Sequence, residues 1–301
     1  MTDQADGLRN IVKSDASTGR NALMGSQAKV EFPKVVAVTS GKGGVGKTNI
    51  VGNMAVALQK SGKRVVIIDA DVGLANIDII FNIQSKYDIS HVVSGEKKLS
   101  EIMVTTHHGI KIVPGGSGFS HLTQLAEGEK LNLLSEFETL QNYGDIIFVD
   151  TGAGISSNVL YFNAAADECV VIATKEPTSI TDAYALMKVL SNDYKVKYFK
   201  LIVNMVNSEK EAKLVYSSLS SAIDKFLKNV VLEYIGYVPT DTEMQKAVLK
   251  RKLILETEQN AEASKNIEKI AFKIDAAEII SSSNGNIKFF MNKVLGTVTN
   301  T

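Results

Sequence analysis

Apolar stretches of strand length alternate with segments of helical periodicity from Pro33 onward. The apolar stretches are nearly continuous runs of Val and Ile, which is typical of strands buried on both faces. Strands are predicted at Val35–Thr39, Arg64–Asp69, Ile110–Val113, Asp145–Asp150, Glu168–Ala173, Phe199–Asn204 and Val231–Val238. This alternation predicts an α/β fold, in which a mostly parallel twisted sheet is covered by helices on both faces.

Helical patterns separate several of these strands and continue after the last one. Helices are predicted at Asn49–Ser61, Glu127–Gln141, Thr181–Asn192, Glu209–Leu227, Thr242–Leu249 and Ala261–Ile280. Ligands of such sheets bind at the carboxyl ends of the strands, so the residues that follow each strand are the first candidates for a functional site.

The two ends of the chain depart from this pattern. Residues 1–33 are polar and glycine-containing without a sustained apolar pattern, which predicts a flexible extension with one candidate helix at Asp3–Lys13. Residues 34–280 are expected to form the folded domain. Residues 281–301 begin with a turn-rich linker and end in a short apolar-rich segment.

Composition excludes several classes of protein. Lysine plus arginine equals aspartate plus glutamate, 33 each, so bulk attraction to nucleic acid is not expected. Cys169 is the single cysteine, which excludes disulfides within the chain and iron–sulfur sites built by one chain. No segment reaches the roughly 18 consecutive apolar residues of a membrane span, and the first residues lack a signal-peptide core. We therefore expect a soluble, cytoplasmic protein.

A glycine-rich loop follows the first predicted strand. Its sequence fits the phosphate-loop pattern G-x-x-x-x-G-K-[ST] between a strand and a helix. Backbone N–H groups and the positive end of the following helix would hold phosphate oxygens, with Lys47 on the β- and γ-phosphates and the Thr48 hydroxyl on Mg²⁺. The candidate nucleotide-binding residues are Gly41, Lys42, Gly43, Gly44, Val45, Gly46, Lys47, Thr48 and Asn49.

Carboxylates end two other strands. Asp69 and Asp71 close the second predicted strand, and Asp150 closes the fourth. A strand-ending aspartate that supports Mg²⁺ is the usual second part of a phosphate-loop site, although a single such aspartate is also common in turns. The backbone at Gly152, just beyond Asp150, is placed to sense a γ-phosphate.

Three segments together resemble one family. Lys42 inside the loop, the segment from Asp69 to Leu74 and the segment from Asp150 to Gly154 are similar to the deviant-Walker ATPases related to MinD and ParA. The resemblance covers about Pro33 to Lys250. It implies Mg²⁺-dependent hydrolysis of ATP by a homodimer that encloses two nucleotides.

The resemblance also assigns roles to individual residues. Lys42 would reach the phosphates bound by the partner subunit, and Asp71 would position the attacking water beside Lys47. Thr48, Asp150 and Asp71 would form the metal site. Asn204 and Pro239 would flank the adenine, and Glu176 with Pro177 would approach the dimer interface. Lys42 could instead be a solvated loop lysine, and Asn204 and Pro239 could be strand-ending turn residues.

The start of the chain resembles the flagellar branch of this family, known as FlhG, FleN or YlxH. The match is Asp3-Gln4-Ala5-Asp6-Gly7-Leu8-Arg9, with Gly7 as a poor helix former at a variable position. By this resemblance, the segment would dock as a helix on the GTPase FlhF and stimulate it. The partner-binding residues would be Asp3, Gln4, Leu8 and Arg9.

The last segment has the spacing of an amphipathic helix. Its apolar residues are Ile287, Phe289, Phe290, Met291, Val294 and Leu295, with lysines toward the polar side. The resemblance implies a membrane-targeting helix, which would place the ATP-bound protein at the cytoplasmic face of the inner membrane. The alternative is a terminal helix that packs on the domain's own surface.

These features predict an ATP-dependent switch that controls flagellar number and placement. The partners implied by the resemblance are a second copy of the chain, FlhF, flagellar switch-ring proteins and a flagellar transcription activator. Two alternatives stay open: a division-site MinD, which shares the ATPase core, and a ParA-like DNA-segregation ATPase. The second needs a basic surface patch and is less favoured, because the residues that could form one are only scattered: Lys225, Lys228, Lys246, Lys250, Arg251 and Lys252.

Overall fold

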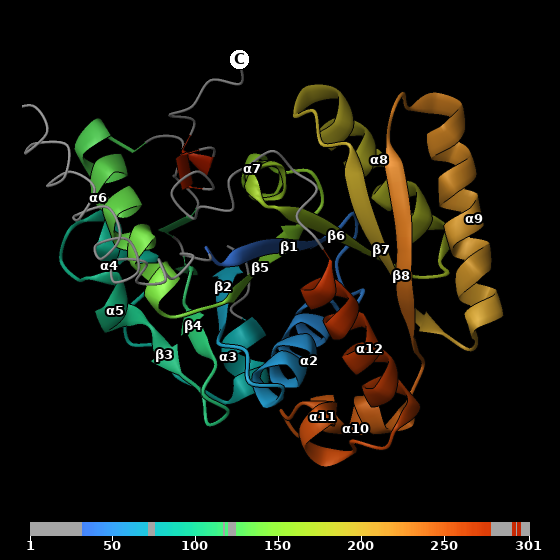
Figure 1. Ribbon diagram of the computed structural model, residues 1–301, viewed down its shortest axis with the longest axis horizontal. Coiled ribbons are helices and arrows are strands. Elements are labelled where there is room, and N and C mark those ends of the chain that lie inside the picture. The colour runs from blue at the N-terminus through green and yellow to red at the C-terminus, as the bar shows by residue number, and fades with distance from the viewer. Residues whose placement is uncertain are drawn as a thin grey trace, which may run out of the picture. The chain divides into compact units, whose positions relative to one another are not determined.

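The fold is an eight-stranded sheet between two layers of helices (Figure 1). The computed structural model describes residues 32–71, 76–116, 118–119, 125–277, 291–292 and 294–295. Within them the strands are ordered β3-β4-β2-β5-β1-β6-β7-β8, and all neighbouring pairs are parallel except β3 with β4. The predicted fold class is confirmed.

The seven predicted strands are present, and the structure adds a two-residue strand at one edge. The strands are β1 (Lys34–Ser40), β2 (Val65–Ala70), β3 (Val104–Thr105), β4 (Lys111–Val113), β5 (Ile146–Ala153), β6 (Glu168–Ala173), β7 (Tyr198–Val206) and β8 (Val231–Pro239). The edge strand β3 was not predicted, because two residues carry no periodicity.

The long helices agree with the predictions to within a few residues. They are α2 (Lys47–Lys60), α6 (Glu127–Glu138) with a 3-10 turn at Thr139–Asn142, α8 (Pro177–Asp193), α9 (Glu209–Phe226), α10 (Thr242–Leu249) and α12 (Glu262–Ala276). Five shorter helices were not predicted: α3 (Asn76–Phe81), α4 (Ile89–Val93), α5 (Leu99–Ile102), α7 (Ser157–Ala165) and α11 (Ile254–Thr257).

Alternating residues of each central strand enter different cores. In β1, Val36 and Val38 pack in one hydrophobic cluster, and Val35 and Ala37 pack in another on the opposite face. Helices α2, α3 and α10–α12 cover the first face, and α4–α9 cover the second. Because both faces are covered, the strands need no polar side, which explains their continuous Val and Ile runs.

The described part of the C-terminal segment belongs to the core. Met291, Val294 and Leu295 are at most 2% exposed and share a cluster with Phe119 and Phe137. In this conformation the three side chains pack on the domain, as in the alternative considered for this helix, and do not face outward toward a membrane. The reason is that the α4–α7 face of the sheet supplies apolar surface that they can bury. Ile287, Phe289 and Phe290 lie outside the described residues, as do Asp3, Gln4, Leu8 and Arg9.

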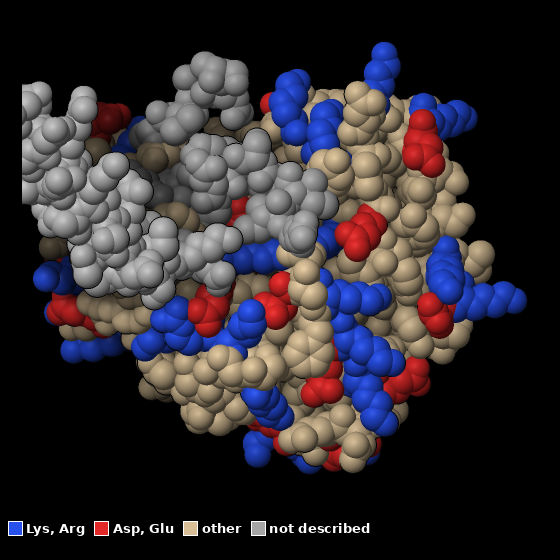
Figure 2. Space-filling model, in the orientation of Figure 1, with Lys and Arg blue, Asp and Glu red and all other residues tan. Residues whose placement is uncertain are grey.

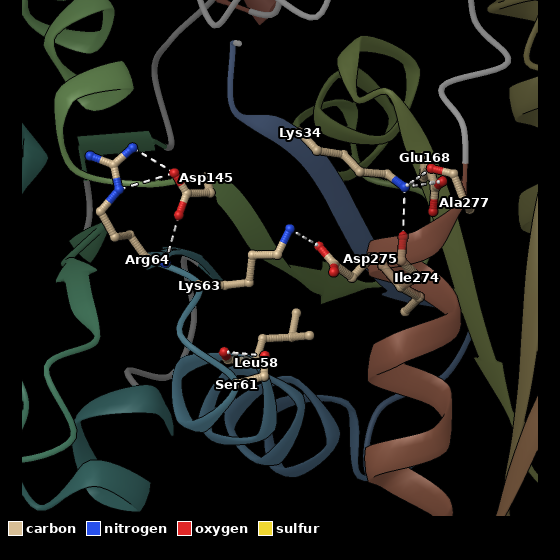
Figure 3. Close-up of polar contacts among 10 residues, drawn as sticks. All are labelled: Lys34, Leu58, Ser61, Lys63, Arg64, Asp145, Glu168, Ile274, Asp275 and Ala277. Atoms are coloured by element: carbon tan, nitrogen blue, oxygen red, sulfur yellow. Dashed lines mark hydrogen bonds and ion pairs between the residues drawn. The ribbon is translucent and has the colours of Figure 1, made fainter.

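A buried charge cluster closes the amino ends of the central strands, and Figure 3 shows the contacts of Lys34 within it. Lys34 Nζ lies 2.7 Å from Glu168 Oε1, and Lys200 Nζ lies 2.7 Å from Glu168 Oε2. Lys34 also donates to the carbonyl oxygens of Ile274 and Ala277 at the end of α12, at 2.6 and 2.7 Å. Burial lowers the pKa of Lys34, while Glu168 opposes that change. The cluster joins β1, β6, β7 and α12 at the end of the sheet opposite the glycine-rich loop.

None of the helices in the described ranges is long and apolar enough to cross a membrane.

Candidate nucleotide-binding site

The glycine-rich loop connects β1 to α2 and depends on its glycines at three points. Gly44 and Gly46 have φ angles of 78° and 83°, in the left-handed region that favours glycine. A Cβ on Gly46 would meet the side chain of Asn204, and a Cβ on Gly41 would clash with the backbone of α8 at Asp182. The loop is therefore held between α8 and β7, and its backbone leads into the N-terminus of α2, where anions bind well.

A cavity of about 800 Å³ opens beside this loop. Most of the predicted nucleotide-binding residues line it, together with Asp71 from the end of β2. These lining residues are Gly43, Gly44, Val45, Gly46, Lys47, Thr48, Asn49, Asp71, Asn204 and Pro239. Gly41, Lys42, Asp150 and Gly152 are not among its lining residues. A nucleoside triphosphate is of the size that such a cavity accommodates.

Lys47 lines the cavity and contacts Asp150, which is buried behind it. Lys47 Nζ lies 3.5 Å from Asp150 Oδ1, and both side chains are almost fully buried. Burial raises the pKa of Asp150, while the Lys47 ammonium and the Thr48 hydroxyl act against that rise. Apart from this long ion pair, neither carboxylate oxygen of Asp150 has a partner in good hydrogen-bond geometry. A buried carboxylate whose oxygens have lone pairs available can bind a cation.

Three carboxylates converge at this point. Asp69 lies opposite Asp150 in the register of β2 and β5, and burial together with Asp150 raises the pKa of Asp69 to about 8. A Cβ on Gly152 would lie 3.5 Å from Asp71 Oδ1, so the ends of the two strands bring Asp71 close to Gly152. The carboxylates of Asp69, Asp71 and Asp150, with the Thr48 hydroxyl, fit the oxygen chemistry that Mg²⁺ requires. Asp69 was expected at the strand end but was not predicted as a site residue.

Lys42 points away from the cavity of its own chain. Its Nζ lies 2.5 Å from Glu176 Oε2 and 3.1 Å from Thr178 Oγ1, at the N-terminus of α8. The Lys42 side chain is 39% exposed and that of Glu176 is 61% exposed. The pair therefore sits at the surface, and the structure does not place Lys42 on the phosphate site that its own loop forms.

Asn204 supports the loop from β7. Its Nδ2 donates to the carbonyl oxygen of Val45 at 2.7 Å, and its Oδ1 accepts from the backbone N–H of Met205 at 2.9 Å. Met205 has a φ angle of 58°, which turns the chain sharply at the cavity rim. Asn204 thus has a defined role as a support of the loop. A contact with adenine remains a prediction.

Apolar side chains that were not predicted as site residues form the outer wall of the cavity. They are Ile79 and Ile80 from α3, Met205, and Met244, Val248 and Leu249 from α10. Leu249 is 85% exposed and Val248 is 43% exposed, which is unusual for large aliphatic side chains. The amphipathic pattern of α10 was visible in the sequence, but its position over the cavity was not.

Most of the chain matches one family of P-loop NTPases. A family profile described as ParA, NUBPL iron-transfer P-loop NTPase, matches residues 31–275. The words iron-transfer belong to the name of the profile and do not describe this chain. In this chain Cys169 is buried and its thiol donates to Asn163 Oδ1 at 3.2 Å, so it cannot serve as a metal ligand in this conformation.

Individual relatives indicate the branch of this family to which the chain belongs. The antiactivator FleN of Pseudomonas aeruginosa is 36% identical over 272 residues, covering 90% of this chain and 96% of the relative. The flagellum site-determining protein YlxH of Helicobacter pylori is 38% identical, covering 79% of this chain and 80% of the relative. Among solved structures, the MinC:MinD cell division protein complex of Aquifex aeolicus superposes with a TM-score of 0.64 at 27% identity, covering 83% of this chain and 98% of the matched chain. The chain belongs to the MinD/ParA family of P-loop NTPases, in the flagellar branch that contains FleN and YlxH.

Proposed function

We propose that the protein is a Mg²⁺-dependent ATPase that dimerises on ATP and uses this switch to control flagellar number and placement. The observation that carries the ATPase part is the meeting of Lys47, Asp150 and Asp71 around a glycine-rich loop at one end of the sheet. The names of FleN and YlxH support the flagellar part.

The loop and Lys47 bind and orient the phosphates of ATP. Phosphoryl transfer needs positioned positive charge more than covalent participation by the protein, and Lys47 is held in place by its buried contact with Asp150. Thr48, Asp150 and Asp71 would hold Mg²⁺, which neutralises charge on the β- and γ-phosphates. The buried carboxylate of Asp150, whose oxygens make only a long ion pair with Lys47, supports this assignment.

Asp71 orients the attacking water. The oxygen of this water bonds to the γ-phosphorus as the bond to the bridging oxygen of ADP breaks, and the products are ADP and inorganic phosphate. Asp71 lines the cavity next to Gly152. Its carboxylate holds a water hydrogen at this point, so removal of the carboxylate slows hydrolysis more than binding.

Lys42 completes the site of the partner subunit. Its exposed ion pair with Glu176 places the ammonium on the outer surface, where a second copy of the chain can approach. A surface ion pair of this kind contributes only about 0–1 kcal/mol, so its exchange for a triphosphate costs little. Hydrolysis then depends on dimerisation.

A flagellar role requires partner proteins, in addition to the similarity to FleN and YlxH. We propose that residues 3–9, with Gln4 and Arg9, dock on FlhF and stimulate its GTPase activity, and that switch-ring proteins and a transcription activator are further partners. Purified FlhF with a peptide spanning residues 1–20 tests this, with Gln4→Ala as the matched control. Faster GTP hydrolysis that depends on Gln4 is expected, and no stimulation would leave the ATPase assignment without the FlhF partner.

We also propose that the ATP-bound dimer associates with the cytoplasmic face of the inner membrane through residues 286–301. Because Met291, Val294 and Leu295 are core residues in this conformation, association requires them to leave the α4–α7 face. A dimer presents two copies of residues 286–301, so it binds the membrane more tightly than a monomer does.

Two related functions are less favoured. A division-site MinD shares the core, but the match to the Aquifex complex has lower identity than those to FleN and YlxH. A DNA-segregation ATPase needs a basic surface, whereas positive and negative side chains are interspersed over the face shown in Figure 2. A salt-sensitive shift of DNA on a gel in the presence of ATP would favour this last function.

A further inference from the structure

A second cluster of possible ligands lies at the turn between β3 and β4. His107 and His108 occupy this turn, and both side chains point toward Glu256 of α11. His108 Nε2 lies 2.5 Å from Glu256 Oε1, and His107 Nε2 lies 3.3 Å from the same oxygen. Two imidazole nitrogens from adjacent residues therefore converge on one carboxylate oxygen.

The hairpin turn makes this convergence possible. Adjacent side chains in a strand point to opposite faces, but here the backbone N–H of Gly109 donates to the Thr106 carbonyl at 2.9 Å and closes a tight turn. Gly109 has a φ angle of 83° in the left-handed region. The two imidazole rings lie side by side, with centroids 4.0 Å apart.

Helix α2 holds the other half of the cluster in place. Lys60 Nζ donates to the Leu255 carbonyl at 2.9 Å, and the Leu255 N–H donates to Asn53 Oδ1 at 3.1 Å. Leu255 is fully buried, so Glu256 projects from a fixed short helix. A Cβ on Gly109 would lie 3.3 Å from Gln59 Nε2, which brings the hairpin against the same end of α2. Both sides of the cluster are thus positioned by one helix.

We propose that His107, His108 and Glu256 form a binding site for a transition-metal dication of the zinc class. The three ligand atoms all lie within 4.8 Å of one another, which a central ion with bonds of about 2.0–2.2 Å can span after small side-chain adjustments. Two imidazoles and one carboxylate favour Zn²⁺, Co²⁺, Ni²⁺ or Cu²⁺ over Mg²⁺ and Ca²⁺. The His107 side chain is 63% exposed, so the ion has an entry path and a position open to water.

This site is separate from the nucleotide cavity. The cavity lies at the N-terminus of α2, whereas the cluster lies at its C-terminal end, about 20 Å away along a 14-residue helix. Bound metal would join the edge hairpin to α11, the helix that follows α10 of the cavity wall (Figure 1). The site takes an ion that the ATPase reaction does not use, and its test does not depend on ATP hydrolysis.

The test is calorimetric titration of ZnCl₂ into the full chain without an affinity tag, after treatment with a chelator and without nucleotide. One equivalent of Zn²⁺ is expected to bind, and Co²⁺ at the same site is expected to give visible d–d absorption. His108→Ala and Glu256→Gln should weaken binding by at least about tenfold. His107→Ala should weaken zinc binding in the same way. Because the His107 side chain is exposed, this variant should fold normally, and circular dichroism checks that each variant is folded.

His91→Ala is the matched control. His91 caps α4 through Asp88 and lies outside the cluster, so its loss should leave zinc affinity unchanged. Unchanged zinc binding in the His107→Ala, His108→Ala double variant would overturn the proposal. A wild-type chain that binds no zinc would overturn it as well, because the cluster would then be a hydrogen-bonded contact only.

Discussion

The Lys42 ammonium lies 2.5 Å from a carboxylate oxygen of Glu176 in its own chain, on the outer surface beside the nucleotide cavity. The loop lysine that distinguishes this chain from a plain phosphate-loop protein is therefore held by a neighbour before any second subunit arrives. The exposed pair is weak enough to exchange, so Glu176 positions Lys42 without locking it.

Replacing Glu176 with Gln should make ATP-dependent dimerisation slightly easier. The substitution removes an exposed ion pair worth at most about 1 kcal/mol, so the dimer dissociation constant should fall by no more than about fivefold. Sedimentation at several protein concentrations measures this change. A loss of dimerisation would mean that Glu176 contributes to the interface directly.

Asp69 should make the nucleotide-free protein less stable as pH rises. Its pKa is raised to about 8 in the folded chain and lies near 4 in an unfolded one, so the folded chain retains a proton between these values. The stabilising contribution is complete below pH 4 and declines up to pH 8, with a slope of at most about 1.4 kcal/mol per pH unit. Asp69→Asn should flatten this decline in urea unfolding measured from pH 5 to pH 8. An identical slope in the variant would contradict the assignment.

The buried charge cluster should be sensitive to loss of its carboxylate. Glu168→Gln leaves Lys34 and Lys200 buried without the carboxylate that they share, and the expected loss of stability is about 3–5 kcal/mol. Denaturant unfolding measures it. The triple variant Lys34→Met, Glu168→Leu, Lys200→Met removes all three charges and should recover much of that loss. If Glu168→Gln alone has no effect, the cluster does not hold α12 to the sheet.

Deleting residues 286–301 should have two effects that can be measured separately. Loss of the buried Met291, Val294 and Leu295 lowers the melting temperature, and loss of the amphipathic segment abolishes co-sedimentation with anionic liposomes in ATP. Phe226→Ser removes an exposed aromatic side chain elsewhere and should change neither. Unchanged liposome binding after the deletion would rule out this segment as the membrane contact.

The sequence predicted the elements that are long and regular. Runs such as Val65–Asp69 and Ile146–Asp150 indicate buried strands, and the motif at Gly41–Thr48 places the phosphate site at their carboxyl ends. The two-residue strand β3 and the short helix α3 carry no recognisable periodicity. Helix α7 is longer, but its apolar residues run consecutively from Val159 to Phe162 and do not recur at helical spacing.

Contacts between residues that are far apart in the chain could not be predicted from the sequence, for a different reason. Lys42 and Glu176, or His108 and Glu256, are separated by more than 100 positions, and no local pattern encodes their meeting. An amphipathic spacing also shows that a helix has an apolar face but not what covers it. For Met291, Val294 and Leu295 the covering surface in this conformation is the domain itself.

The central claim is that two subunits share their nucleotide sites, and the assembly state of the Asp71→Ala protein tests it most directly. This variant keeps the loop, Lys47 and Lys42 but cannot orient the attacking water. By sedimentation velocity it should be a stable dimer in Mg-ATP and a monomer in Mg-ADP, while Lys42→Ala should bind nucleotide and stay monomeric in both. An Asp71→Ala protein that remains monomeric in saturating Mg-ATP would contradict the account.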